Sequence, residues 1–157
     1  MKTKLFWIPT VVLMIIIFYF SSQPAEVSGN LSGGIAYRIV RLTADVTGQE
    51  WKEEELILLA EKLDYPIRKM AHLTEYALLG MAVALGGVHG SGWSSYSIKK
   101  QYFLVQVIGS LYAAGDEIHQ LFVPGRAGLV ADVLIDSLGI LIGWLVFYLF
   151  VNVSELY

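Results

Sequence analysis

Four short stretches that border or enter the apolar segments of the chain hold side chains suited to binding or catalysis. The clearest stretch holds Arg68, His72 and Glu75, whose spacing places all three on one stripe of a helix. Arginine is suited to bidentate recognition of phosphate or carboxylate, and histidine beside a carboxylate is suited to proton transfer. The other three stretches hold Ser22 and Gln23; Asp116, Glu117, His119 and Gln120; and Arg126, Asp132 and Asp136.

Each of these side chains has a chemical interpretation. The catalytic candidates, as general acids or bases, are His72, Glu75, Asp116, Glu117 and His119. The ligand-binding candidates are Ser22, Gln23, Arg68, Gln120 and Arg126. Simpler roles are open to some of them, since an arginine at a helix end can extend toward lipid head groups and a serine can end a helix.

Two aspartates raise the question of a bound metal. Asp132 and Asp136, together with Glu117, could supply the oxygen ligands that Mg²⁺ or Mn²⁺ prefers. The same aspartates could equally pair with Arg126 and Arg68 and only tie helices together. Two histidines, at positions 72 and 119, could bind zinc, but no H-E-x-x-H motif occurs and an interhelical hydrogen bond is simpler. A divalent cation is therefore possible, and its identity stays open.

The composition of the chain indicates that these side chains belong to a membrane protein. Of 157 residues, 55% are hydrophobic and 16% are charged, and the mean hydropathy is +0.57. A soluble domain has about 25% charged residues, so the chain is expected to be an integral membrane protein. The net charge of −3 and the absence of a basic run exclude a nucleic-acid partner. The absence of cysteine excludes disulfides, thiolate nucleophiles and cysteine-bound metals.

The apolar residues form four segments, each about 20 residues long, as a helix that spans a bilayer requires. They predict a single all-α domain over 1–157, a polytopic membrane protein with transmembrane helices at about 5–22, 68–88, 102–123 and 129–153. A secretory signal peptide is the alternative for the first segment. The lysines at positions 2, 4, 99 and 100 favour an N-in, C-in topology.

The polar stretch 23–67 is then an extended extracytoplasmic loop. Its pattern predicts two short interfacial helices, at 35–46 and 50–64, with a loop at 30–34 and with Pro66 ending the second helix.

Consecutive crossings alternate in direction, which has a consequence for the four polar stretches. All of them must lie on one side of the membrane at similar depth, the outer side in the N-in topology. Ionisable residues in a bilayer usually face the bundle interior and mark a site. The pattern Gly139-x-x-x-Gly143 lies on the same stripe as Asp132 and Asp136 and permits close approach of a neighbouring helix. The carboxylates are therefore expected to point into the bundle.

Taken in order, these motifs resemble the VanZ-like family of bacterial membrane proteins. The matching pieces are 20–23 (FSSQ), 68–76 (RKMAHLTEY), 112–126 (YAAGDEIHQLFVPGR) and 132–139 (DVLIDSLG), followed by Gly143. One departure is Gly115, where the family more often has serine. The resemblance implies a helical protein with four crossings in the bacterial plasma membrane, and it implies an association with teicoplanin resistance. It assigns no reaction and no catalytic residue.

Three functions follow as hypotheses. The first is an envelope protein that binds a lipid-linked or lipoglycopeptide-like ligand at the outer face, with Arg68 and Arg126 holding an anion. The second is a metal-dependent hydrolase or phosphatase acting on a lipid phosphate, and the third is a proton- or ion-coupled transporter. Membrane lipids or a lipid-linked envelope intermediate are the expected partners, and the oligomeric state is left open. A pocket of several hundred Å³ would favour a ligand, whereas arginines fully paired with Asp132 and Asp136 would favour a structural role.

Overall fold

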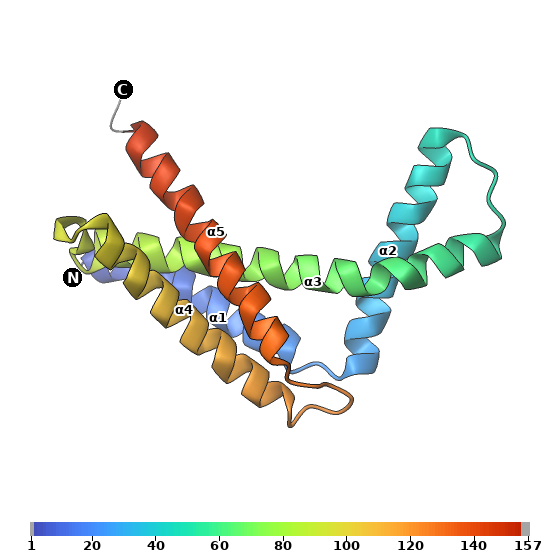
Figure 1. Cartoon of the computed structure of the whole chain (residues 1–157), viewed down its shortest axis with the longest axis horizontal. Helices are drawn as coiled ribbons and strands as arrows, with labels where there is room; N and C mark the ends of the chain where they lie inside the picture. The colour runs from blue at the N-terminus through green and yellow to red at the C-terminus, as the bar shows by residue number, and fades with distance from the viewer. Residues whose placement is uncertain (1, 155–157) are drawn as a thin grey trace.

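Helices make up nearly all of residues 2–154, the part of the chain that this computed structural model describes (Figure 1). In chain order they are η1 (Lys2–Trp7), α1 (Ile8–Ser21), α2 (Ala25–Thr47), α3 (Glu53–Leu85), η2 (Gly86–Gly90), η3 (Trp93–Ser95), α4 (Ile98–Gln120) and α5 (Val130–Ser154). No strand occurs within 2–154, so the all-α prediction is confirmed.

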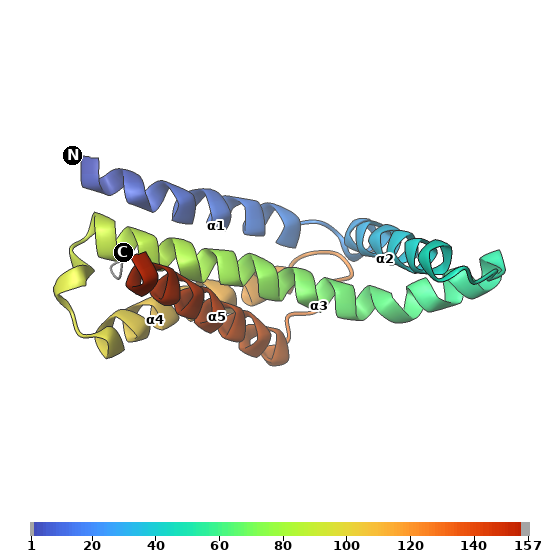
Figure 2. The ribbon, with the colours of Figure 1, turned by 90° about the horizontal axis from the view of Figure 1, so that it is seen from above.

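Four of the helices, α1, α3, α4 and α5, form one bundle (Figure 1, Figure 2). α1 and α4 run in one direction along it, and α3 and α5 run in the other. Its core contains Ile17 from α1, Tyr76 and Leu79 from α3, Ala113 from α4 and Ile140 from α5, all of them buried. Because every one of the four helices contributes to one cluster, the ends of the helices are held in fixed positions relative to one another.

The remaining long helix, α2, lies beyond the bundle and packs against the first half of α3 (Figure 2). Ala36, Val40 and Ala44 are spaced four apart, so they share one stripe of α2, and they form a second buried cluster with Ala60 of α3. α2 ends at Gly48, whose φ of 67° is a left-handed conformation that glycine adopts without strain. α2 and the first half of α3 thus form a helical hairpin that extends the bundle at one end.

Two expectations about the loop 23–67 are wrong. Residues 30–34 lie inside α2, and the helix expected to end at Pro66 continues as α3 to Leu85. The proline removes one backbone hydrogen bond, but α3 packs on α2 before it and in the bundle after it, and this packing outweighs the loss. The glycines that suggested a loop at 33 and 34 face open space, whereas Ser32 is buried.

Glycines set the distance between α3 and α5. A methyl group built on Gly143 would overlap the carbonyl oxygen of Ala77, and one built on Gly139 would lie 2.6 Å from the carbonyl oxygen of Leu73. Gly80 of α3 meets the backbone of α5 in the same way. The prediction that the Gly139-x-x-x-Gly143 pattern permits close helix approach is therefore confirmed.

Three of the helical segments are long and apolar enough to cross a membrane, namely 4–21, 53–90 and 130–151, which identifies a membrane protein. α4 does not reach the same hydropathy, since its 23 residues include Lys99, Lys100, Asp116 and Glu117. The four crossings and the N-in, C-in topology stay predictions.

The topology predicts which turns of the chain face outward. The chain has no native cysteine, so single cysteines can be placed at Gln49, in the turn between α2 and α3, and at Ser94, in the turn between α3 and α4. In the expected topology a membrane-impermeant maleimide labels the Gln49→Cys variant on intact cells and labels the Ser94→Cys variant only after permeabilisation. The reverse pattern would invert the topology, and labelling of both on intact cells would contradict a membrane-crossing α3.

Candidate functional site

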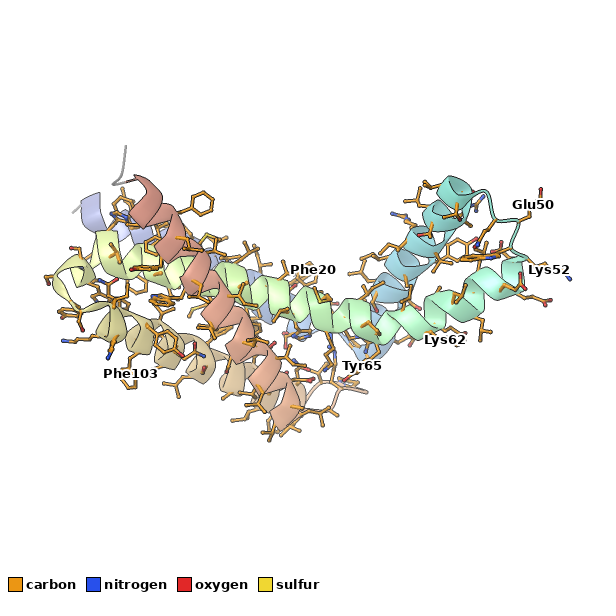
Figure 3. The ribbon with its side chains drawn as sticks, turned by 45° about the horizontal axis from the view of Figure 1, so that its top comes forward. Phe20, Glu50, Lys52, Lys62, Tyr65 and Phe103 are labelled. Carbon is orange, nitrogen blue, oxygen red and sulfur yellow. The ribbon has the colours of Figure 1, made fainter. Side chains whose placement is uncertain are left out.

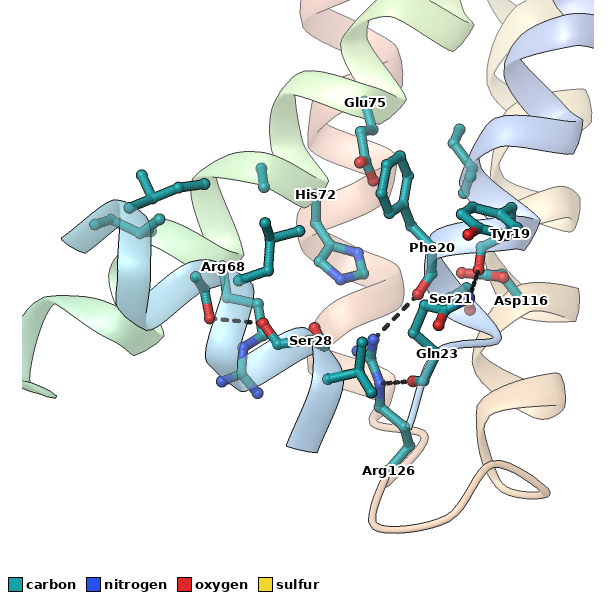
Figure 4. A pocket seen from close by; sticks show the side chains of 17 residues that line it. Tyr19, Phe20, Ser21, Gln23, Ser28, Arg68, His72, Glu75, Asp116 and Arg126 are labelled. Carbon is teal, nitrogen blue, oxygen red and sulfur yellow. Dashed lines mark hydrogen bonds between the residues drawn. The ribbon is translucent and has the colours of Figure 1, made fainter. Parts of the chain in front are cut away.

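A cavity of about 360 Å³ lies where the end of α1, the start of α2, the middle of α3 and the end of α4 meet (Figure 4). One part of its lining is apolar and includes Ile17, Phe20, Val27, Leu31, Ile35 and Ile67. The polar part of its lining includes Ser21, Gln23, Ser28, Ser32, Arg68, His72, Glu75, Asp116 and Arg126. The cavity therefore combines a hydrocarbon-like wall with both acidic and basic side chains.

The polar stripe of α3 faces this cavity. Arg68, His72 and Glu75 all line it, as their spacing on one side of the helix requires. In the close view His72 lies between Arg68 and Glu75 along the helix (Figure 4). Each of the other three polar stretches contributes a lining residue, namely Gln23, Asp116 and Arg126, so the structure brings all four stretches together at one cavity.

Arg126 reaches the cavity from the loop between α4 and α5. Its Nε donates a hydrogen bond to the carbonyl oxygen of Gln23 at 3.1 Å, and its Nη2 donates one to that of Phe20 at 3.3 Å (Figure 4). These bonds tie the loop to the connection between α1 and α2. Partial burial, together with the positive charge of Arg68, lowers the pKa of the Arg126 guanidinium from its usual value. Acidic neighbours oppose this shift, and an arginine stays charged in any case.

Arg68 is held by the hairpin. Its Nη2 donates to Oδ2 of Asp64 at 2.6 Å, and the hydroxyl of Ser32 on α2 donates to the other oxygen of the same carboxylate. The Nε of Arg68 is buried and has no hydrogen-bond partner. A buried donor without a partner is costly, so this N–H is available to an anion in the adjoining cavity.

Two acidic residues of α5 pair with α3, although not with the expected partners. Nδ1 of His72 lies 3.6 Å from Oδ1 of Asp136, and Nζ of Lys69 donates to Oδ1 of Asp132. The alternative in which the two aspartates pair with Arg126 and Arg68 is therefore wrong. Asp132 and Asp136, on successive turns of α5, face Lys69 and His72, which are three residues apart on α3.

This pairing also bears on the metal hypothesis. Asp132 pairs with Lys69, Asp136 lies beside His72, and Glu117 is engaged elsewhere. Among the residues described, no group of three or more histidine, aspartate or glutamate side chains converges on a point that could hold a metal ion. The residues present do not fit the predicted site.

Several candidates on α4 stabilise the loop that follows it instead of lining the cavity. Oε2 of Glu117 accepts a hydrogen bond of 2.9 Å from the backbone N–H of Leu129, and Oε1 accepts one of 3.0 Å from Gln120. His119 shares a hydrogen bond of 3.1 Å with the hydroxyl of Ser22. These contacts join the end of α4 to the start of α5 and to the end of α1, and they leave none of the four side chains in the cavity lining.

Asp116 is the member of this stretch that does line the cavity. It is 4% exposed; its Oδ2 accepts a hydrogen bond of 3.3 Å from the hydroxyl of Tyr76, and its Oδ1 has no partner. Ser21, for which the sequence favoured only a role in ending the first helix, is also 4% exposed, lines the cavity and has a hydroxyl without a partner. Ser28 and Ser32 were missed too. Their spacing of four, continued by Ala36, was a signal that α2 turns one face toward α3.

Comparison with known proteins identifies one family. A family model described as VanZ/LLP1 matches residues 6–151, which include every residue that lines the cavity. No curated protein and no solved structure matches the chain.

Proposed function

Because this chain belongs to the VanZ/LLP1 family, we propose that it is a membrane protein of the bacterial cell envelope whose cavity binds an ionised amphiphile, either lipid-linked or lipoglycopeptide-like. The single observation that carries the proposal is a cavity of about 360 Å³ at which two arginines remain free of the α5 aspartates. Its volume lies in the range of small-molecule sites.

The lining of the cavity supports an amphiphile over a water-soluble anion. Arg68 and Arg126 supply guanidinium donors of the kind that recognise phosphate and carboxylate. Leu31 and Ile35 of α2 line the same cavity and are also exposed, so the apolar wall continues onto the surface of the protein. A hydrocarbon chain in the bilayer can therefore reach the cavity while its head group meets the arginines.

The teicoplanin-resistance-type role is a special case of this proposal. It requires that the same cavity take a lipoglycopeptide, a class in which a hydrocarbon chain is joined to ionised groups. The metal-dependent hydrolase is not proposed, because its donor set is not assembled in the described part of the chain.

The proposal predicts that anionic lipid binding depends on Arg68. The purified full chain is titrated with phosphatidylglycerol, and bound lipid is counted by native mass spectrometry. The Arg68→Gln variant is expected to bind at least about 10-fold more weakly, the effect of losing one charge-assisted hydrogen bond. Arg68→Lys retains the charge and should recover part of the affinity.

Arg38→Gln is the matched control, since Arg38 is an exposed arginine of α2 that does not line the cavity. Equal binding by wild type, Arg68→Gln and Arg38→Gln would contradict the proposal. Displacement of the bound lipid by teicoplanin would favour the lipoglycopeptide as a ligand, and failure to displace it would favour a lipid-linked one.

A further inference from the structure

We propose that the cavity has two oppositely charged subsites and takes a zwitterionic head group, with an anion at Arg68 and Arg126 and a primary ammonium at Glu75 and Asp116. This inference rests on the proposed function and names the chemical class of the head group. The two arginines and the two carboxylates line the same cavity (Figure 4).

The acidic subsite contains two buried side-chain oxygens that lack a hydrogen-bond partner. Asp116 lines the cavity and is only 4% exposed. Its Oδ1 has no hydrogen-bond partner. Within the described chain, no hydrogen bond or ion pair to a cation engages the Glu75 carboxylate. Ser21 adds a buried hydroxyl, also without a partner, beside Asp116 (Figure 4). An ammonium carries three N–H donors, and these three side chains offer acceptors for them.

The two subsites lie at different depths. Arg68 and Glu75 are seven residues apart on α3, which corresponds to about 10 Å along the helix axis. Arg126 lies in the loop near the open end of the bundle, whereas Asp116 lies one turn inside the end of α4. The arginines therefore lie toward the loop between α4 and α5, and the carboxylates lie farther along the bundle, with His72 between Arg68 and Glu75 on α3. A head group with one charge of each sign can span this arrangement.

Charge balance separates a zwitterion from a simple anion. Neither Glu75 nor Asp116 forms an ion pair with a lysine or arginine of the described chain, so a ligand that carries only a negative charge would leave these two carboxylates without a counter-ion. Uncompensated charge in a partly buried site is unfavourable. A phosphodiester joined to a primary ammonium, as in phosphoethanolamine, places an anion beside Arg126 and the Asp64-paired Arg68, and a cation beside the two carboxylates.

The test uses two lipids that differ only in the ammonium. Phosphatidylethanolamine and phosphatidylethanol have the same phosphodiester and acyl chains, and each is titrated into the purified full chain with native mass spectrometry as the readout. Wild-type protein is expected to prefer phosphatidylethanolamine by about 10-fold, the value of one charge-assisted hydrogen bond. Phosphatidylcholine, whose quaternary ammonium has no N–H donor, is expected to bind more weakly than phosphatidylethanolamine.

The variants assign the subsite. Glu75→Gln and Asp116→Asn are each expected to reduce the preference for phosphatidylethanolamine to about 2-fold or less, while binding of phosphatidylethanol is retained. Glu54→Gln, an exposed glutamate in the first turn of α3, is the matched control and should retain the full preference. Circular dichroism verifies that each variant is folded, and the Glu75→Gln variant carries the test if Asp116→Asn does not fold.

Each outcome has a distinct meaning. If wild type binds phosphatidylethanolamine and phosphatidylethanol equally, and Arg68→Gln binds both more weakly, the proposal of a zwitterionic head group is overturned and the proposed function stands. A preference that survives in both Glu75→Gln and Asp116→Asn would overturn the assignment of the acidic subsite. Failure of every lipid to bind would overturn the proposed function as well.

Discussion

Replacing Gly143 with alanine is expected to lower the free energy of unfolding by about 2–3 kcal/mol, the usual cost of forcing an extra methyl group into a packed interface. The added methyl would overlap the carbonyl oxygen of Ala77, so α5 would have to move away from α3. Alanine is the better helix former by about 1 kcal/mol. Helix propensity alone would therefore predict that Gly143→Ala is more stable than wild type. A loss of stability would instead show that α5 lies against α3 at this position.

The measurement is thermal unfolding of the purified protein in detergent, followed by circular dichroism. A loss of this size corresponds to a decrease in Tm of about 5–10 °C for a chain of this length. Gly139→Ala, where a methyl group would lie 2.6 Å from the carbonyl oxygen of Leu73, is expected to act in the same direction.

Gly115→Ala is the control for this experiment. Gly115 is also a helical glycine, but a methyl group built on it meets nothing within 4 Å, so this variant should keep or slightly raise the Tm. If Gly143→Ala were as stable as Gly115→Ala, the close approach of α3 and α5 would be contradicted.

Removing His72 is expected to cost about 3 kcal/mol of stability, because it leaves the Asp136 carboxylate buried without a partner. Asp136 is 0% exposed and both of its oxygens lack a hydrogen bond, and within the described chain its one ion-pair contact is with Nδ1 of His72, 3.6 Å from Oδ1. Asp136→Ala is expected to cost less, since a histidine that lines the cavity can remain neutral.

A double-mutant cycle isolates the interaction between these two residues. The double variant His72→Ala/Asp136→Ala is expected to be at least about 1 kcal/mol more stable than the sum of the single effects predicts. Unfolding of all four proteins in the same detergent supplies the measurement. As a control, His89→Ala combined with Asp136→Ala should be additive, since the ring of His89 contacts Phe6 and Phe147 and not this aspartate. Additivity in the His72 cycle would mean that the pair contributes nothing to stability.

Much of the site could be predicted from the sequence by two simple rules. Helical periodicity placed Arg68, His72 and Glu75 on one face, and all three line the cavity. The alternation of consecutive crossings brought the end of α1, the end of α4 and the start of α5 to the same end of the bundle, as observed (Figure 1). The glycine pattern on α5 predicted a close helix contact, which occurs with α3.

Other features depended on tertiary packing that outweighs local helix-breaking residues, and local sequence patterns do not show this packing. Pro66 is a helix breaker by itself, yet α3 continues through it, because buried contacts on both sides compensate one lost hydrogen bond. The glycines at 33 and 34 suggested a loop, but the buried stripe that contains Ala36 stabilises a helix there. The hairpin, which supplies one wall of the cavity, was therefore missed as a unit (Figure 3).

Residue types, their spacing and the alternating direction of the helices are enough to predict a helical membrane protein whose four short polar stretches meet at one end of the bundle. These properties follow from residue type, spacing and chain direction, which the sequence contains. The contacts of Asp136 with His72 and of Asp132 with Lys69, and the position of the two arginines at the cavity, cannot be read from the sequence and required the folded chain. Those pairings depend on the rotation of each helix about its axis and on its distance from the neighbouring helix. Contacts elsewhere in the bundle, such as Gly143 against Ala77, fix the rotation and the distance.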